Sequence, residues 1–155
     1  MWRKTTSLLP RRQARGLRRL IWNFRNGRMQ RSLALATAAS APPLAFEIYT
    51  EHFKGSFGDK WMWTPILLSP PLTLAGLAAY RSPAVAKTAL PLLSALYALD
   101  GIIGIVTHVR GIGRKPGGFG EPTYNIVMGP PLLAPGSLLM VGGMGLLAPV
   151  MRREI

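Results

Sequence analysis

Cysteine is absent from the 155-residue chain. Its absence excludes disulfide bonds, thiolate metal ligands and a cysteine nucleophile. The sequence also lacks a Cys-x-x-Cys-His haem-attachment motif and a Glu-x-x-His metal pair. No motif that we recognise pairs a serine with a histidine, so nucleophilic catalysis has no support either. These absences favour a protein that is not itself an enzyme.

Acidic residues are scarce, six against 19 lysines and arginines, and none occurs in the first 31 positions. Ten basic residues fill that stretch, namely Arg3, Lys4, Arg11, Arg12, Arg15, Arg18, Arg19, Arg25, Arg28 and Arg31. A basic block directly before the first apolar segment is typical of the cytoplasmic side of a membrane protein, so we expect a cytoplasmic N-terminus. We do not expect nucleic-acid binding, because no recognised nucleic-acid-binding module accompanies the charge.

Long polar stretches are missing as well, because four apolar segments take up most of the chain. Each is close to the ~20 helical residues that cross a hydrocarbon core of ~30 Å. The segments cover residues 32–50, 61–80, 84–109 and 124–150. We therefore predict an all-α, polytopic transmembrane four-helix bundle over residues 32–151, with a short cytoplasmic tail at 152–155, in a bacterial inner membrane.

The basic N-terminal segment, residues 1–31, contains the pattern of an amphipathic helix at 11–31. Leu17, Leu20, Ile21 and Phe24 follow an i, i+3, i+4, i+7 spacing and form one apolar stripe. Such a helix lies in the membrane interface, where its charges bind anionic headgroups and its stripe is buried. The candidate headgroup ligands are Arg11, Arg12, Arg15, Arg18, Arg19 and Arg25. The alternative is a disordered basic tail that only sets the topology.

Proline and glycine positions predict how the spans pack. Pro-Pro-Leu occurs at 42–44, 70–72 and 130–132, and each proline pair is expected to kink its helix. Ala-Ser-Ala at 39–41 resembles a signal cleavage site, but the following prolines disfavour cleavage, so we expect the first span to be retained. A glycine every seven residues in the fourth span predicts a seam for close helix approach, at Gly129, Gly136 and Gly143.

One face of the third span is polar. On a helical wheel one arc holds Ser94, Tyr97, Asp100, Gly101, Gly104, Thr107 and His108, and the opposite arc is aliphatic. The first face is expected to meet protein, water or a ligand, and the second to meet lipid.

Ionisable residues inside a span are costly against lipid, so they are candidates for function. Asp100 in the third span and Glu47 in the first are the candidates for a proton site or a quinone head-group site. Tyr97 is the predicted hydrogen-bond partner in that site. In the predicted topology these groups gather near the outer face.

The two histidines are the candidates for a metal or haem site, because imidazole is a ligand for both. His52 and His108 fall at outer helix ends, and Glu51 precedes the first of them. The alternative, which applies to Asp100 and Glu47 as well, is that these groups only pair with one another or with basic residues at the same end of the bundle, Arg110, Arg114 and Lys115.

The loop at 111–120 is rich in glycine and basic residues. It lacks Gly-Lys-Ser/Thr and does not follow a predicted strand, so a phosphate-binding loop is not expected. Arg114, Lys115 and Phe119 give it the character of a partner-docking or headgroup-binding loop.

The function that these features favour is a small, non-catalytic membrane subunit that anchors or connects a larger inner-membrane complex. A redox or respiratory complex is the favoured kind, with a quinone or haem held near the outer face. The expected partners are membrane lipids and other membrane subunits. One alternative is a homo-oligomeric transporter or channel with Asp100 on the pathway. A second is a membrane metalloenzyme that uses Glu47, His52, Asp100 and His108.

Overall fold

The computed structural model describes residues 11–154, with side chains from Arg15 onward. These residues form helices and no β-strand, which confirms the predicted all-α class. The helices are α1 (Arg11–Arg25), α2 (Gln30–Lys54), α3 (Thr64–Arg81), α4 (Pro83–Lys87), α5 (Ala89–Gly113), α6 (Pro122–Val127) and α7 (Leu133–Leu147). Three short 3₁₀ helices join or extend them: η1 (Lys60–Trp63), η2 (Gly118–Gly120) and η3 (Ala148–Val150).

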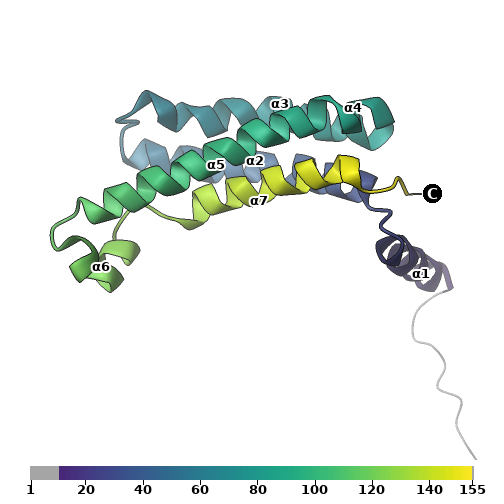
Figure 1. The fold of residues 1–155 in the computed structure, drawn as a ribbon, viewed down its shortest axis with the longest axis horizontal. Helices are drawn as coiled ribbons and strands as arrows, with labels where there is room; N and C mark the ends of the chain where they lie inside the picture. The colour runs from purple at the N-terminus through teal and green to yellow at the C-terminus, as the bar shows by residue number, and fades with distance from the viewer. Residues whose placement is uncertain (1–10, 155) are drawn as a thin grey trace, which may run out of the picture.

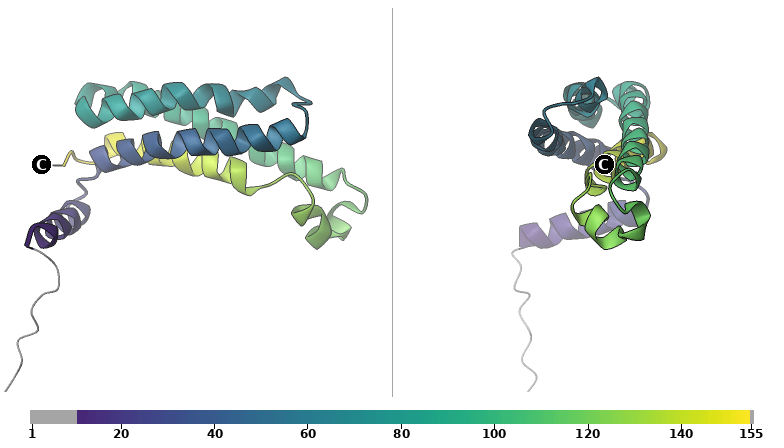
Figure 2. Two further views of the ribbon diagram at one scale, coloured as in Figure 1. Left: turned by 180° about the vertical axis from the view of Figure 1, so that it is seen from behind. Right: turned by 90° about the vertical axis from the view of Figure 1, so that its left-hand side faces the viewer.

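Four long helices, α2, α3, α5 and α7, lie side by side, and we refer to them together as the bundle (Figures 1 and 2). The chain runs back and forth along the bundle, so each long helix is antiparallel to the next. The start of α2 and residues 151–154 lie at one end, with α4, and we call it the terminal end. The turn before α3 and helix α6 lie at the opposite end, which we call the far end. Helix α1 projects away from the terminal end.

Three helical stretches are long and apolar enough to cross a membrane. They are Lys60–Arg81, Pro83–Gly113 and Leu133–Val150. Helix α2 is as long as α5, at 25 residues, but it is not among the three. It contains the pair Pro42–Pro43 and the charged Glu47, which lower its hydropathy.

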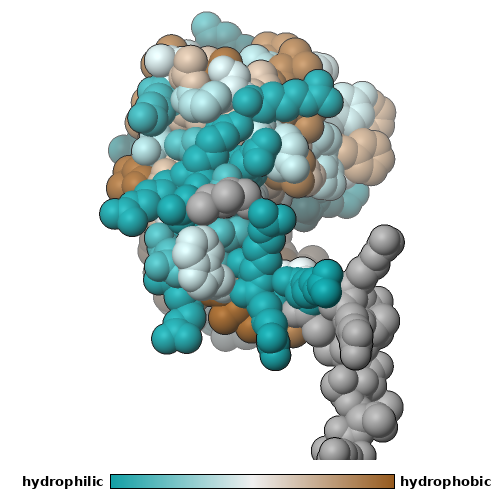
Figure 3. Space-filling view, turned by 90° about the vertical axis from the view of Figure 1, so that its right-hand side faces the viewer, coloured by the Kyte–Doolittle hydropathy of each residue, from teal (hydrophilic) through white to brown (hydrophobic). Residues whose placement is uncertain are grey.

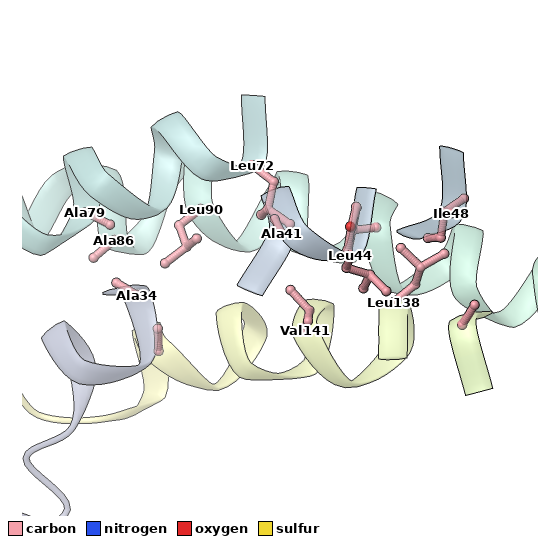
Figure 4. Close-up of a cluster of buried hydrophobic side chains, with 13 residues drawn as sticks. Ala34, Ala41, Leu44, Ile48, Leu72, Ala79, Ala86, Leu90, Leu138 and Val141 are labelled. Carbon is pink, nitrogen blue, oxygen red and sulfur yellow. The ribbon is translucent and has the colours of Figure 1, made fainter. Parts of the chain in front are cut away.

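The side chains are arranged with large apolar groups outside and small ones inside. Buried positions along the bundle are often alanine, interleaved with leucine and valine (Figure 4). Large aliphatic and aromatic side chains are exposed on every long helix, including Leu35, Phe46, Leu67, Leu74, Leu92, Ile102, Ile103, Leu139 and Met140. Such an extensive exposed apolar surface marks a membrane or partner contact. On α5 the predicted division into an inner and an outer arc is confirmed for most residues; Ala98 is an exception, since it is buried.

Proline pairs act differently in different helices. The pairs at 42–43 and 70–71 lie inside the uninterrupted helices α2 and α3. The pair at 130–131 lies in a break between α6 and α7, so the last long helix begins at Leu133 and not near residue 124. At the break, Gly129 and the two prolines are all poor helix formers. Pro135 is tolerated because it lies in the first turn of α7, where its missing N–H is not needed.

Glycines bring the helices into close contact, but the predicted seam is wrong for α7. A Cβ atom at Gly136 or Gly143 would have nothing within 4 Å, so both face open space. The close approach occurs one residue earlier, at Gly142, where a Cβ would lie 2.7 Å from the Ser94 carbonyl oxygen of α5. Gly76 of α3 plays the same part against α2, since its Cβ would lie 2.7 Å from the Ala34 carbonyl oxygen. Helix α7 has glycines on two faces, and spacing alone cannot choose between them.

Candidate functional site

A short polar contact inside the bundle joins α3 to α5. The Thr64 hydroxyl donates to Asp100 Oδ1 at 2.6 Å, and it also lies 2.8 Å from the Trp61 carbonyl oxygen. The other carboxylate oxygen, Asp100 Oδ2, is buried and has no hydrogen-bond partner. The candidate site at Asp100 therefore consists of one satisfied oxygen and one buried acceptor without a donor.

A second polar contact lies one turn further into the bundle. Tyr97 is fully buried, and its hydroxyl lies 2.9 Å from Ser69 Oγ. Ser69 donates its only hydroxyl proton to the Pro65 carbonyl oxygen at 2.7 Å, so Tyr97 must be the donor to Ser69. The Tyr97 hydroxyl is thus engaged with α3, and its predicted role as a hydrogen-bond partner in a proton or quinone site stays a prediction.

Both candidate histidines are held by backbone carbonyl groups. His52 Nδ1 lies 3.0 Å from the Met62 carbonyl oxygen, and His108 Nδ1 lies 2.6 Å from that of Pro131. A carbonyl oxygen can only accept, so Nδ1 carries a proton in each ring, and in the neutral form of the ring Nε2 has the lone pair. This is the tautomer of histidines that bind metals through Nε2.

The acidic candidates do not gather around the histidines as closely as predicted. Glu51 forms an ion pair with Lys54 on the same helix, at 2.5 Å. Glu47 is exposed on α2. Among residues 11–154 there is no group of three or more histidine, aspartate or glutamate side chains placed to hold a metal ion.

An aromatic cluster at the far end was not foreseen from the sequence. Phe57 and Trp63 stack with ring centroids 4.2 Å apart, and Tyr49 packs against both. Ser56 and Phe57 have positive φ angles of 57° and 47°, a strained backbone for residues other than glycine. The stacking holds this turn in place next to His52, whose ring packs edge-on against Phe57.

The loop between α5 and α6 is folded back on itself. Lys115 donates to the Met128 carbonyl oxygen at 2.8 Å, so this candidate docking residue is engaged within the chain. Asn125 is buried and donates to the carbonyl oxygens of Pro116 and Gly118. Arg114 and Phe119 are exposed and stay available to a partner.

At the terminal end, Arg153 and Glu154 hold two helices together, and we call these two residues the clasp. Sequence reasoning missed it. Glu154 accepts hydrogen bonds from the backbone N–H groups of Arg31 and Ser32, at 2.7 and 2.8 Å, and so caps the start of α2. Arg153 donates to the Tyr80 and Ala79 carbonyl oxygens, at 2.7 and 3.3 Å, and so caps the end of α3. The predicted short tail is therefore a structural element that joins two helices.

The pKa of Glu154 reflects this capping. Burial, the largest single effect, favours the neutral acid, but the hydrogen bonds from Ser32 and Arg31 together outweigh it and lower the pKa. The carboxylate form is therefore the one that holds the clasp.

Positive charge gathers around the clasp. Figure 3 shows hydrophilic side chains spread over the terminal end. The basic residues there are Arg28, Arg31, Arg81, Lys87, Arg152 and Arg153, and Glu154 is the one acidic residue among them. Helix α1 adds Arg15, Arg18, Arg19 and Arg25, all exposed, as is its apolar stripe of Leu17, Leu20, Ile21 and Phe24. The other predicted headgroup ligands, the side chains of Arg11 and Arg12, lie outside the described residues.

Comparison of the chain with protein-family models, with curated proteins and with solved structures finds no match.

Proposed function

We propose that the protein is a small non-catalytic subunit of a bacterial inner-membrane complex, in which α2, α3, α5 and α7 all cross the bilayer. The observation that carries this proposal is an apolar bundle whose two ends differ in charge. Basic residues dominate the terminal end, which suits the cytoplasmic face. The far end balances five basic residues, Lys54, Lys60, Arg110, Arg114 and Lys115, with four acidic ones, Glu47, Glu51, Asp59 and Glu121.

Helix α2 crosses the membrane in this proposal because of what it packs against. It lies along the length of α3 and also contacts α7, and both of those belong to the three apolar stretches. Its prolines leave the helix uninterrupted. The Thr37 hydroxyl inside it donates a hydrogen bond to the Leu33 carbonyl oxygen of the same helix. A helix of 25 residues seated between two spanning helices has the length to span as well.

The role of a subunit, rather than of a free-standing enzyme, is supported by where the polar groups are used. Thr64–Asp100 and Ser69–Tyr97 are contacts between α3 and α5, which hold the bundle together. On the outside, Gly136 and Gly143 leave open space on α7, a surface on which a neighbouring helix can come close. The exposed Arg114 and Phe119 offer a contact outside the membrane.

The redox form of this proposal depends on the far end. The unpartnered Asp100 Oδ2 is an acceptor for a quinol hydroxyl, and the free Nε2 atoms of His52 and His108 are possible haem ligands. A second candidate function, a homo-oligomeric transporter or channel, is favoured by the same buried oxygen, because an unsatisfied carboxylate in a span is a typical feature of an ion pathway.

Purification in mild detergent, followed by subunit mass spectrometry and an absorption spectrum, tests these alternatives. Foreign subunits in stoichiometric amounts support the proposal, and a Soret band supports its haem form. A lone homo-oligomer supports the transporter. Asp100→Asn then separates the two directly, since it should leave a subunit's assembly intact but abolish ion flux in proteoliposomes. A replacement of Gly136 and Gly143 by leucine should release the partners, whereas the matched replacement Gly120→Leu should not.

A further inference from the structure

A cavity of about 260 Å³ lies between α1 and the start of α2, apart from the polar site at the far end. Its lining is almost entirely apolar and includes Leu20, Ile21 and Phe24 from the stripe of α1, and Met29 from the connection to α2. The polar residues that line this cavity are Asn23, Arg28 and Ser32. An apolar pocket with a guanidinium group at its edge has the two parts that a phospholipid would require.

Two of the residues that line the cavity each have a buried polar atom without a hydrogen-bond partner. One is Nε of Arg28, a donor, and the other is Oδ1 of Asn23, an acceptor. Buried polar groups in folded proteins are almost always paired, so each unpaired one needs an explanation. A phosphodiester oxygen is the strongest partner for a guanidinium N–H, and a headgroup hydroxyl is a suitable donor to an amide oxygen.

The position of Arg28 is fixed by contacts within the chain. Its guanidinium carbon lies 5.3 Å from the centre of the Trp22 ring, and its Nη1 donates to the Arg153 carbonyl oxygen at 3.4 Å. The backbone around it is held by the tail, because Arg152 N–H donates to the Gly27 carbonyl oxygen at 2.9 Å. The guanidinium group is thus held at a fixed place at the cavity, and a ligand would meet a preformed group.

We propose that this cavity binds one anionic glycerophospholipid with a hydroxyl-bearing headgroup, such as phosphatidylglycerol. The phosphate accepts from the Arg28 guanidinium group, a headgroup hydroxyl pairs with the Asn23 side chain, and an acyl chain covers the apolar lining. The surrounding charge favours an anionic lipid over a zwitterionic one, since Arg18 and Arg25 are exposed on the same helix. The inference rests on the proposed membrane location, because it requires α1 to lie at the level of the headgroups.

The test uses the full chain, delipidated in detergent and titrated with phosphatidylglycerol, phosphatidylcholine or inorganic phosphate, with bound molecules counted by native mass spectrometry. One tightly held phosphatidylglycerol is expected, with weaker binding of phosphatidylcholine. Arg28→Gln should weaken phosphatidylglycerol binding about tenfold, because a charged hydrogen bond is lost. Arg81→Gln removes the same charge from an exposed residue that does not line the cavity, and should have little effect.

Asn23→Leu provides a second variant that does not alter the charge. It should reduce the preference for phosphatidylglycerol over phosphatidic acid, whose headgroup has no glycerol hydroxyl. Equal loss in Arg28→Gln and Arg81→Gln, or no preference over phosphatidylcholine, would overturn the inference and leave the membrane location intact. Binding of free phosphate with the same Arg28 dependence would show an anion site instead of a lipid site. A chain that stays monodisperse without detergent would instead refute the proposed function.

Discussion

The Thr64 hydroxyl lies 2.6 Å from Asp100 Oδ1 and ties the first turn of α3 to the middle of α5. The contact brings together two helices that both belong to the apolar stretches long enough to span a membrane. In lipid the competition from water for such a hydrogen bond is small, although measured values for single contacts remain modest.

Thr64→Val should therefore destabilise the bundle by about 1 kcal/mol. The replacement keeps the shape of the side chain and removes only the hydroxyl. The free energy of unfolding in mixed micelles measures the effect. Thr107→Val is the matched control, because Thr107 is exposed and donates only to the Gly104 carbonyl oxygen of its own helix. Equal losses in the two variants would show that the contact between helices adds nothing.

Gly142→Ala should cost about 1–3 kcal/mol, since it overpacks the interface between α7 and α5. The new Cβ would lie 2.7 Å from Ala98 N and from the Ser94 carbonyl oxygen, both of which are backbone atoms that cannot turn aside. Gly143→Ala, one residue later, meets open space and should be neutral or stabilising by up to ~1 kcal/mol, because alanine is the better helix former. Thermal unfolding in detergent compares the two; the reverse order would mean that α7 is rotated relative to this structure.

Arg153→Ala should destabilise the terminal end by about 2 kcal/mol, because it removes charged hydrogen bonds to the Tyr80 and Ala79 carbonyl oxygens and to Gln30 Oε1. The neighbouring Arg152 has an exposed side chain, so Arg152→Ala removes the same charge without these contacts. Hydrogen exchange at the last turn of α3 should rise only in the first variant. A similar rise in both would mean that charge alone holds this end together.

The Glu154 cap should respond to pH in a defined direction. Its pKa is lowered below the ordinary 4.5, so the folded state binds fewer protons and the cap is complete above pH 4.5. The stabilisation is lost as the pH falls through the lower pKa of the folded state. Amide NMR signals of Arg31 and Ser32, the two donors, report this titration. Midpoints at or above pH 4.5 would contradict the capping geometry, and Glu154→Gln should abolish the titration.

The helical class and the division of residues on α5 could be predicted because they depend on local composition and periodicity. Exposed Ile102 and buried Tyr97 follow from a 3.6-residue repeat in which one face is aliphatic. The start of α7 could not be predicted in the same way. The three proline pairs look alike in sequence. Only the surrounding helix formers and the packing decide that the pair at 130–131 interrupts the helix.

The candidate site was predicted only in part, because most of its partners are distant in sequence. The pairing of Asp100 with Thr64 spans 36 residues, and that of Glu154 with Ser32 spans 122. Nothing local marks either contact. The sequence placed Tyr97 and Asp100 on one helical face, but it could not show that the tyrosine hydroxyl contacts Ser69 on the neighbouring helix.

The number of membrane crossings is tested most directly by single-cysteine labelling, which has no background because the chain contains no cysteine. Asn26→Cys lies before α2, Gly58→Cys lies after it, and Gly120→Cys lies beyond α5. With four crossings, a membrane-impermeant thiol reagent outside intact cells should label residues 58 and 120 but reach residue 26 only in inverted vesicles. Labelling of residues 26 and 58 from the same side would show that α2 does not cross, and would contradict the account.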